Sequence, residues 1–212
     1  MLKINEIFYS IQGESSLVGC PTVFVRTSGC HLRCHYCDTQ YAYFDGQKQT
    51  LSDVIEDIQT YHTQRVCLTG GEPLLQKEAT DLVSQLCDLG YAVSIETSGD
   101  LDCHAVDPRA KLVIDVKTPD SGECGRFDHR NLELDNRDIE FKFVICSEKD
   151  FAWSEEFAKS NNLFAKSPVL YSPSYGQVSE RWLAEKILTT ASKARFQMQL
   201  HKYLWPDQER GV

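Results

Sequence analysis

Short apolar runs alternate along this chain with segments of helical periodicity, and this alternation constrains its fold more than any other feature. The apolar runs are 21–27, 65–72, 91–99, 111–119, 140–146 and 168–174, and 196–203 closes the series. The segments with helical spacing are 51–62, 74–90, 149–161 and 178–194. Strands that alternate with helices are typical of βαβ units, so we predict an α/β fold with a parallel sheet. The alternation alone does not separate a partial barrel from a doubly wound sheet.

Polar motifs follow the apolar runs at the points where the predicted strands end. They are Thr69-Gly70-Gly71-Glu72, Glu96-Thr97-Ser98-Gly99, Asp115 with Lys117, Ser172 and His201. Ligands bind at the carboxyl edge of the strands in barrels and in open parallel sheets alike. We therefore expect these residues to gather in one site, and we expect the polar segment 120–138 to form a long loop.

Length and charge bound the class of protein. The chain has 212 residues without a repeat or a Pro/Gly/Ser-rich linker, so we predict one domain over 1–212. Its 22 basic and 31 acidic residues give a net charge of −9, which disfavours a nucleic-acid groove but not a small anionic substrate. No apolar run has the length of a membrane span, and the first residues lack a signal-peptide core. We expect a cytoplasmic protein that binds neither nucleic acid nor membranes.

Three of the nine cysteines are clustered in "GCHLRCHYCDTQYAY", as Cys30, Cys34 and Cys37. A structural zinc site takes four ligands, for which His31 or His35 is a candidate fourth, and an iron–sulfur cubane usually takes four cysteines. Three cysteines leave one metal position open, and an open position indicates function because something else must bind there. The other six are expected to be small buried hydrophobes, and the odd total argues against a complete disulfide framework. They are Cys20, Cys67, Cys87, Cys103, Cys124 and Cys146.

The cysteine loop carries Tyr36 before its last cysteine and is followed by "TGGEP" at 69–73, and in these features the chain resembles the radical S-adenosylmethionine (SAM) enzymes. "FYSIQGE", "FVR", "CDT", "ETSG" and "HKY" narrow the resemblance to the 7-carboxy-7-deazaguanine synthases. It covers most of the chain and is weakest over 100–165. It implies one radical SAM domain with a partial (β/α)6-type TIM barrel, in which parallel strands are joined by modified helices.

The resemblance also implies a carbon–nitrogen lyase of queuosine and 7-deazapurine biosynthesis. A reduced [4Fe–4S] cluster passes an electron to SAM, and the resulting 5′-deoxyadenosyl radical takes a hydrogen from C6 of 6-carboxy-5,6,7,8-tetrahydropterin. Ring contraction and loss of ammonia then give 7-carboxy-7-deazaguanine, with SAM regenerated and Mg²⁺ assisting. The implied partners are a reducing donor such as flavodoxin or ferredoxin and a second copy of the chain in a homodimer.

The family's functional residues carry over one by one. The implied cluster ligands are Cys30, Cys34 and Cys37, and the implied magnesium ligand is Thr39. The implied SAM contacts are Tyr36, Cys37, Asp38, Gly70, Gly71, Glu72, Ser98, Asp115 and Lys117. The implied substrate contacts are Ile11, Gln12, Gly13, Glu14, Arg26, Thr69, Glu96 and His201. No side chain is expected to be catalytic, because SAM supplies the radical.

The chemistry of several residues agrees with these roles. Glu14 can accept hydrogen bonds from ring N–H groups, the fork of Arg26 suits a carboxylate, and the hydroxyl of Thr39 suits Mg²⁺. At the glycine motif, the lack of side chains would let the backbone approach SAM closely.

Three positions and the C-terminal tail depart from the family pattern. Ser15 replaces the last glycine of Gln-Gly-Glu-Gly, so we expect a different turn there. Leu200 replaces a threonine, and Ser172 stands where the family often has glutamine. The tail runs nine residues past Tyr203, so the substrate contact that the C-terminal carboxylate makes in some members is not carried over.

Two other functions are compatible with the cysteine loop. A glycyl-radical activase of the same superfamily shares CxxxCxxC, but the Gln-Gly-Glu segment and Asp38-Thr39 argue against it; turnover without a partner protein would separate the two. A non-catalytic zinc module is the more distant alternative, because it explains neither "TGGEP" nor the polar strand ends. Analysis of iron, sulfide and zinc would distinguish it.

Overall fold

The computed structural model describes residues 1–135 and 137–212. These residues form one sheet of nine strands in the order β3-β1-β2-β4-β5-β6-β7-β8-β9. The strands are β1 (Leu2–Ile11), β2 (Pro21–Thr27), β3 (Gln47–Gln49), β4 (Arg65–Gly70), β5 (Ala92–Thr97), β6 (Lys111–Asp115), β7 (Ile139–Ile145), β8 (Val169–Pro173) and β9 (Arg195–Phe196).

The order of the strands decides between the two predicted architectures. From β2 through β4 to β9 each strand pairs in parallel with the next one along the sheet, while β1 pairs antiparallel with both β2 and β3. A doubly wound sheet reverses its strand order at a switch point, whereas a barrel adds its strands in chain order. The sheet is open at β3 and β9. The prediction of a partial barrel is therefore confirmed.

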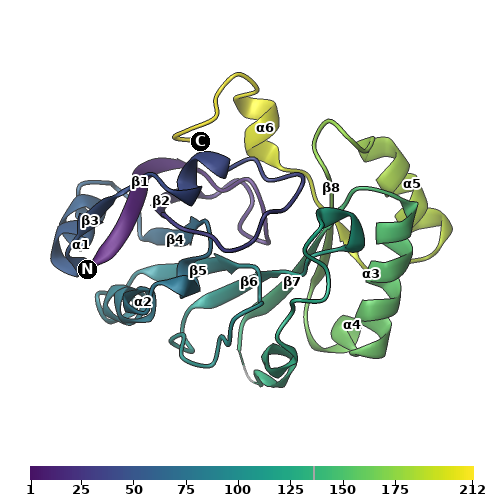
Figure 1. Cartoon of the computed structure of the whole chain (residues 1–212), viewed down its shortest axis with the longest axis horizontal. Helices are drawn as coiled ribbons and strands as arrows, with labels where there is room; N and C mark the ends of the chain where they lie inside the picture. Colours follow the sequence, from purple (N-terminus) through teal and green to yellow (C-terminus); the bar gives the residue numbers. More distant parts are fainter. Residues whose placement is uncertain (136) are drawn as a thin grey trace.

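The helices lie where the periodicity predicted them, with two additions. They are α1 (Leu51–Gln59), α2 (Glu78–Asp88), α3 (Glu148–Ser160), α4 (Leu163–Lys166), α5 (Glu180–Thr189) and α6 (Leu200–Leu204). A capping box starts α1, and serine side chains cap α3 and α5. Figure 1 shows α2 and α6 on opposite sides of the sheet. Every described helix is too short or too polar to cross a membrane.

The connections on either side of β6 contain no α-helix in their described residues, which fits the expected modification of the helices. Between β5 and β6 the chain runs as turns and bends. Between β6 and β7 it forms two 3-10 turns, η3 (Pro119–Ser121) and η4 (His129–Glu133). The predicted loop at 120–138 includes these turns, and its residue 136 lies outside the described residues.

The segment 196–203, placed last in the series of apolar runs, is not a strand. Only Arg195 and Phe196 pair with β8, and the backbone N–H of Gln197 adds a bond of 2.9 Å to the carbonyl of Tyr171. The chain then turns into α6, and the side chain of Gln197 donates a hydrogen bond of 3.0 Å to the carbonyl of Ser15. The long first strand β1 was not predicted.

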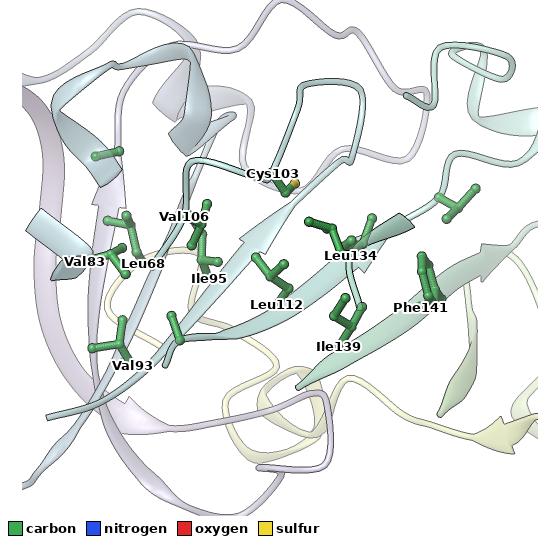
Figure 2. Close-up of a cluster of buried hydrophobic side chains, with 14 of the residues drawn as sticks. Leu68, Val83, Val93, Ile95, Cys103, Val106, Leu112, Leu134, Ile139 and Phe141 are labelled. Atoms are coloured by element: carbon green, nitrogen blue, oxygen red, sulfur yellow. The ribbon is translucent and has the colours of Figure 1, made fainter. Parts of the chain in front are cut away.

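The two faces of the sheet differ in chemistry because side chains alternate along each strand. One face is apolar and packs against helices and loops: Figure 2 shows Leu68, Ile95, Leu112 and Phe141 in one layer with Val83 of α2. The other face carries polar side chains at the intervening positions, namely Thr69, Glu96, Asp115, Glu140 and Lys142. Strands buried on both faces are usually apolar throughout, so the polar face is where a ligand site is expected.

All nine cysteines are free. Cys67 and Cys103 are buried as expected, and Cys20, Cys87 and Cys146 are partly buried. The expectation of burial is wrong for Cys124, which is exposed because it lies in the polar loop that follows η3.

Candidate active site

A cavity of about 310 Å³ opens at the carboxyl ends of the parallel strands. It gathers every predicted site residue except Glu72. Its predicted lining residues are Ile11, Gln12, Gly13, Glu14, Arg26, Cys30, Cys34, Tyr36, Cys37, Asp38, Thr39, Thr69, Gly70, Gly71, Glu96, Ser98, Asp115, Lys117 and His201. Lining residues that the sequence did not single out include Tyr41, Lys142, Tyr175, Gln177, Gln199 and Lys202.

The cysteine loop runs directly from the end of β2 along the cavity wall. Its three thiols are partly buried, and all of them line the cavity. Burial raises the pKa of Cys30, and it raises the pKa of Cys34 to about 11. No three His, Cys, Asp or Glu side chains of the described residues are arranged to hold a single metal ion. Soft sulfur donors on one loop are the ligand set that iron–sulfur clusters take.

The two glycines at the end of β4 allow that strand end to pack against the end of β2 and the cysteine loop. A Cβ on Gly70, whose φ is +134°, would lie 2.3 Å from the carbonyl oxygen of Thr27. A Cβ on Gly71 would lie 2.1 Å from the carbonyl oxygen of Gly29. That carbonyl also accepts a hydrogen bond of 2.9 Å from the N–H of Glu72. The close contacts between these backbone segments therefore require glycine at both positions, whether or not a ligand also approaches this backbone.

Glu72 lies behind the cavity wall and joins β4 to β5. Its buried carboxyl accepts hydrogen bonds from the hydroxyl of Thr97 (2.8 Å) and from the N–H of Ser98 (2.8 Å). The hydroxyl of Ser98 lies 2.6 Å from oxygens of both Glu72 and Asp100. Burial raises the pKa of Glu72. Asp100 in turn contacts His31 of the cysteine loop.

Arg26 meets a carboxylate of the protein itself. Its Nε donates to Oε1 of Glu6 at 2.7 Å, and the hydroxyl of Tyr41 donates to the same oxygen at 3.0 Å. The pair uses only Nε, so the two Nη groups have no hydrogen-bond partner within the described residues. Sequence reasoning missed Glu6, whose partner lies on the neighbouring strand.

The centre of the cavity holds a network of buried charges. Lys142 of β7 forms ion pairs with Glu14 and with Asp115, the latter at 3.1 Å, and Lys117 contacts the same oxygen of Asp115 at 3.2 Å. Burial alone would raise the pKa of Glu14, but the charge of Lys142 lowers it. Glu14 is therefore held as a carboxylate. The alternation of Glu140 and Lys142 in an otherwise apolar run was the sequence signal for this inward-facing lysine.

Glu96 has the opposite tendency. It accepts hydrogen bonds from the side chains of Gln12 (3.2 Å) and Thr69 (3.0 Å). Burial and the nearby charge of Glu14 raise its pKa. The cavity thus presents one carboxylate that is held charged beside one that is biased towards its neutral form.

Gly13 brings α6 over the cavity. A Cβ on this residue would lie 2.1 Å from Nδ1 of His201, and its carbonyl accepts a bond of 2.9 Å from the N–H of Leu200. Burial lowers the pKa of His201.

Ser15 keeps a backbone conformation that glycine favours. Its φ is +64°, and its hydroxyl accepts a hydrogen bond of 3.1 Å from the N–H of Leu17. The serine side chain is therefore accommodated in the left-handed region at this turn.

The C-terminal tail returns to the cavity, a placement that the sequence did not predict. Gln208, Glu209 and Val212 line it, and the N–H of Gly211 donates to Glu6 at 3.2 Å. The guanidinium of Arg210 lies 4.3 Å from the centre of the Tyr41 ring. Figure 1 shows the chain end close to β1 and β2.

Asp38 and Thr39 line the cavity next to the last cysteine of the loop. The hydroxyl of Thr39 donates to Asp38 at 2.9 Å, and Lys202 of α6 pairs with the same carboxylate at 2.8 Å. Burial opposes the charge of Asp38, but Lys202 and Thr39 together lower its pKa to about 2.

Comparisons with known proteins agree with this arrangement. The sequence model of the Radical SAM superfamily matches residues 24–120. A 7-carboxy-7-deazaguanine synthase of Chlorobaculum tepidum is 41% identical over 100% of this chain and 97% of its own length. One of Koribacter versatilis is 35% identical over 100% of both. The crystal structure of QueE from Escherichia coli, 24% identical, matches 94% of each chain with a TM-score of 0.78, which supports the fold.

Proposed function

This chain belongs to the 7-carboxy-7-deazaguanine synthase family of radical SAM enzymes, and from that membership we propose that it converts 6-carboxy-5,6,7,8-tetrahydropterin to 7-carboxy-7-deazaguanine with loss of ammonia. The observation that carries the proposal is one cavity lined by the cysteine loop, the glycine motif and the Gln12–Glu14 segment. Its polar wall and its buried charges suit a small, polar, anionic heterocycle.

The proposed cofactors are a [4Fe–4S] cluster and SAM. Three free thiols on one loop fit three corners of a cubane and leave the fourth iron for SAM. When bound, the pair supplies the radical chemistry that amino-acid side chains lack. Lys117 offers an ammonium for the SAM carboxylate, and its Nζ is 5.6 Å from the centre of the Tyr36 ring. The proposed SAM contacts are Tyr36, Cys37, Asp38, Gly70, Gly71, Ser98, Asp115 and Lys117, with Glu72 acting through Ser98.

The proposed substrate contacts bind the two ends of the heterocycle. Glu14, held as a carboxylate, accepts from ring N–H groups, and the side chain of Gln12 can donate or accept beside it. The Nη groups of Arg26 bind the substrate carboxylate while Glu6 fixes the guanidinium through Nε. Thr69 and the less acidic Glu96 contact the ring between these ends. The remaining proposed contacts are Ile11, Gly13 and His201.

We propose Mg²⁺ as a third cofactor, with the hydroxyl of Thr39 as its protein ligand. A hard cation prefers oxygen ligands and keeps several waters, and Asp38 beside Thr39 can hold one of those waters. Thr39→Ala should reduce the response of turnover to added Mg²⁺ while iron and sulfide contents stay unchanged. An unaltered Mg²⁺ titration would remove Thr39 as the ligand.

The remaining assignments rest on the family. We propose that residues 1–212 act as one radical SAM domain in a cytoplasmic homodimer. We also propose that a flavodoxin or ferredoxin supplies the electron. The continuous sheet from β3 to β9 supports the single domain.

The deciding experiment is an anaerobic incubation of the purified protein with SAM, dithionite, Mg²⁺ and carboxytetrahydropterin. We expect the deazaguanine product without any partner protein, because the cavity takes a small molecule. Cys34→Ala should lose iron, sulfide and turnover together. Stoichiometric zinc without sulfide, or turnover that requires a second protein as substrate, would contradict the proposal.

A further inference from the structure

We propose that Lys142 is a positioning residue, which ties the substrate side of the cavity to its SAM side through Glu14 and Asp115. This inference rests on the proposed function for the identity of the two ligands. The contacts on which it depends belong to the protein alone.

The sheet register places Lys142 between the two carboxylates. In the parallel pair of β6 and β7, Asp115 lies directly opposite Lys142, so both side chains point to the polar face. Glu14 comes from the turn after β1 and reaches the same ammonium group. One buried lysine, with a side chain only 10% exposed, therefore joins three segments that are far apart in the sequence.

The surrounding charges make this lysine hard to replace. The facing groups are Glu96 from β5, Asp115 and Lys117 from the end of β6, and His201 from α6. Without Lys142, Asp115 would keep Lys117, whereas among the residues that the structure describes Glu14 would keep only the side-chain amide of Gln199, at 2.7 Å, as a hydrogen-bond partner of its carboxyl. A buried carboxylate that loses its cation is strongly disfavoured. Glu14 would then move or take up a proton, and either change would weaken it as an acceptor for a ring N–H.

Lys111 provides a contrast that separates function from burial. It lies on the neighbouring strand β6, its side chain is 11% exposed, and it pairs with Asp138 at 2.7 Å and with Glu140 at 3.1 Å. It does not line the cavity. Lys111→Met therefore removes a similarly buried, doubly paired lysine whose two partners do not line the cavity either, and it serves as the matched control.

The main test measures binding of SAM and of carboxytetrahydropterin separately, by calorimetry on anaerobically purified protein with its cluster. Lys142→Met should weaken both ligands by about tenfold or more, since it disturbs a charged contact on each side. Glu14→Gln should weaken only the pterin, and Asp115→Asn only SAM. Lys111→Met should leave both affinities within about twofold of the unchanged protein, as expected for a site without shared partners.

A pH profile distinguishes positioning from a general loss of structure. The charge of Lys142 lowers the pKa of Glu14, so pterin binding persists as the pH falls. Without that charge, burial raises the pKa of Glu14. As the pH is lowered, Lys142→Met should therefore lose pterin binding at a higher pH than the unchanged protein does. Lys142→Arg keeps the positive charge and should retain most of the pterin binding at low pH.

A double variant covers the case in which Lys142→Met does not fold. The double variant Glu14→Gln/Lys142→Met removes both partners of one pair, and it should still bind SAM less tightly than Glu14→Gln. The proposal is overturned if Lys142→Met binds both ligands like Lys111→Met, or if the double variant binds SAM like Glu14→Gln. If the unchanged protein binds SAM but not the pterin, the proposed function fails instead. The SAM comparison and an NMR titration of the Glu14 carboxyl then decide the role of Lys142.

Discussion

Gly71→Ala tests whether backbone packing explains the glycine motif. The new Cβ would lie 2.1 Å from the carbonyl oxygen of Gly29 and 2.9 Å from Cβ of Cys30. An ordinary carbon–oxygen contact is about 3.3 Å, so the cysteine loop must withdraw by about 1 Å. The obstacle is backbone rather than the end of a flexible side chain, and the displacement therefore reaches Cys30 directly.

The magnitude follows from two effects. Overpacking of this size costs about 1–3 kcal/mol. Withdrawal of the Gly29 carbonyl also breaks its hydrogen bond from the N–H of Glu72, and a buried N–H without a partner costs about 1–3 kcal/mol. The sum is about 2–6 kcal/mol, and for a chain of this length each kcal/mol lowers Tm by about 2–4 °C. We expect a fall in Tm of about 10 °C, together with loss of iron.

The assay combines thermal unfolding with iron and sulfide analysis, and Gly90→Ala is its control. Gly90 follows α2 with a φ of +86°, and a Cβ there would have no neighbour within 4 Å. Its substitution costs only the strain of the left-handed conformation, about 1–2 kcal/mol, and should leave the iron content intact. If Gly71→Ala were as stable as Gly90→Ala and retained its iron, close packing would not be the reason for the glycine.

Three further predictions concern the loops around the cavity. Gly13→Ala should displace α6 and weaken pterin binding, because the new Cβ would overlap the ring of His201; calorimetry would detect it. Both Ser15→Gly and Ser15→Ala lose the hydrogen bond from Leu17, but only glycine also relieves the strain of the left-handed backbone at φ +64°. Ser15→Gly should therefore leave the free energy of unfolding nearly unchanged, whereas Ser15→Ala should lower it by about 1 kcal/mol, as urea titration would measure. Burial lowers the pKa of His201, so the unfolded chain binds its proton more readily; stability should fall as the pH drops below about 6.5, and His201→Asn should flatten this part of the pH curve.

The fold could be predicted from the sequence to a considerable extent. Alternating apolar runs gave the strands β2 and β4 to β8, because local periodicity reports which face of an element is buried. Strand β1 was missed, and the run at 196–203 was assigned wrongly. In that run Gln197 bonds to Ser15, which lies 182 residues away along the chain. A contact over such a separation leaves no periodic signal.

For the site, the sequence by itself identified the residues that lie close to one another along the chain. Cys30, Cys34 and Cys37 share one loop, and Gly70 and Gly71 end one strand, so their proximity needs no knowledge of the fold. All five of these residues line the cavity, which agrees with that expectation. The choice between a barrel and a doubly wound sheet, by contrast, required the strand order.

Only the tertiary structure decided how the charges are paired. Arg26 meets Glu6 across an antiparallel pair, Lys142 meets Asp115 across a parallel one, and the tail returns to Glu6 from the other end of the chain. These contacts depend on strand register and on the path of loops, and neither is written in local composition. A burial pattern can show that a lysine faces inward, but its partners are set by which strands lie beside it.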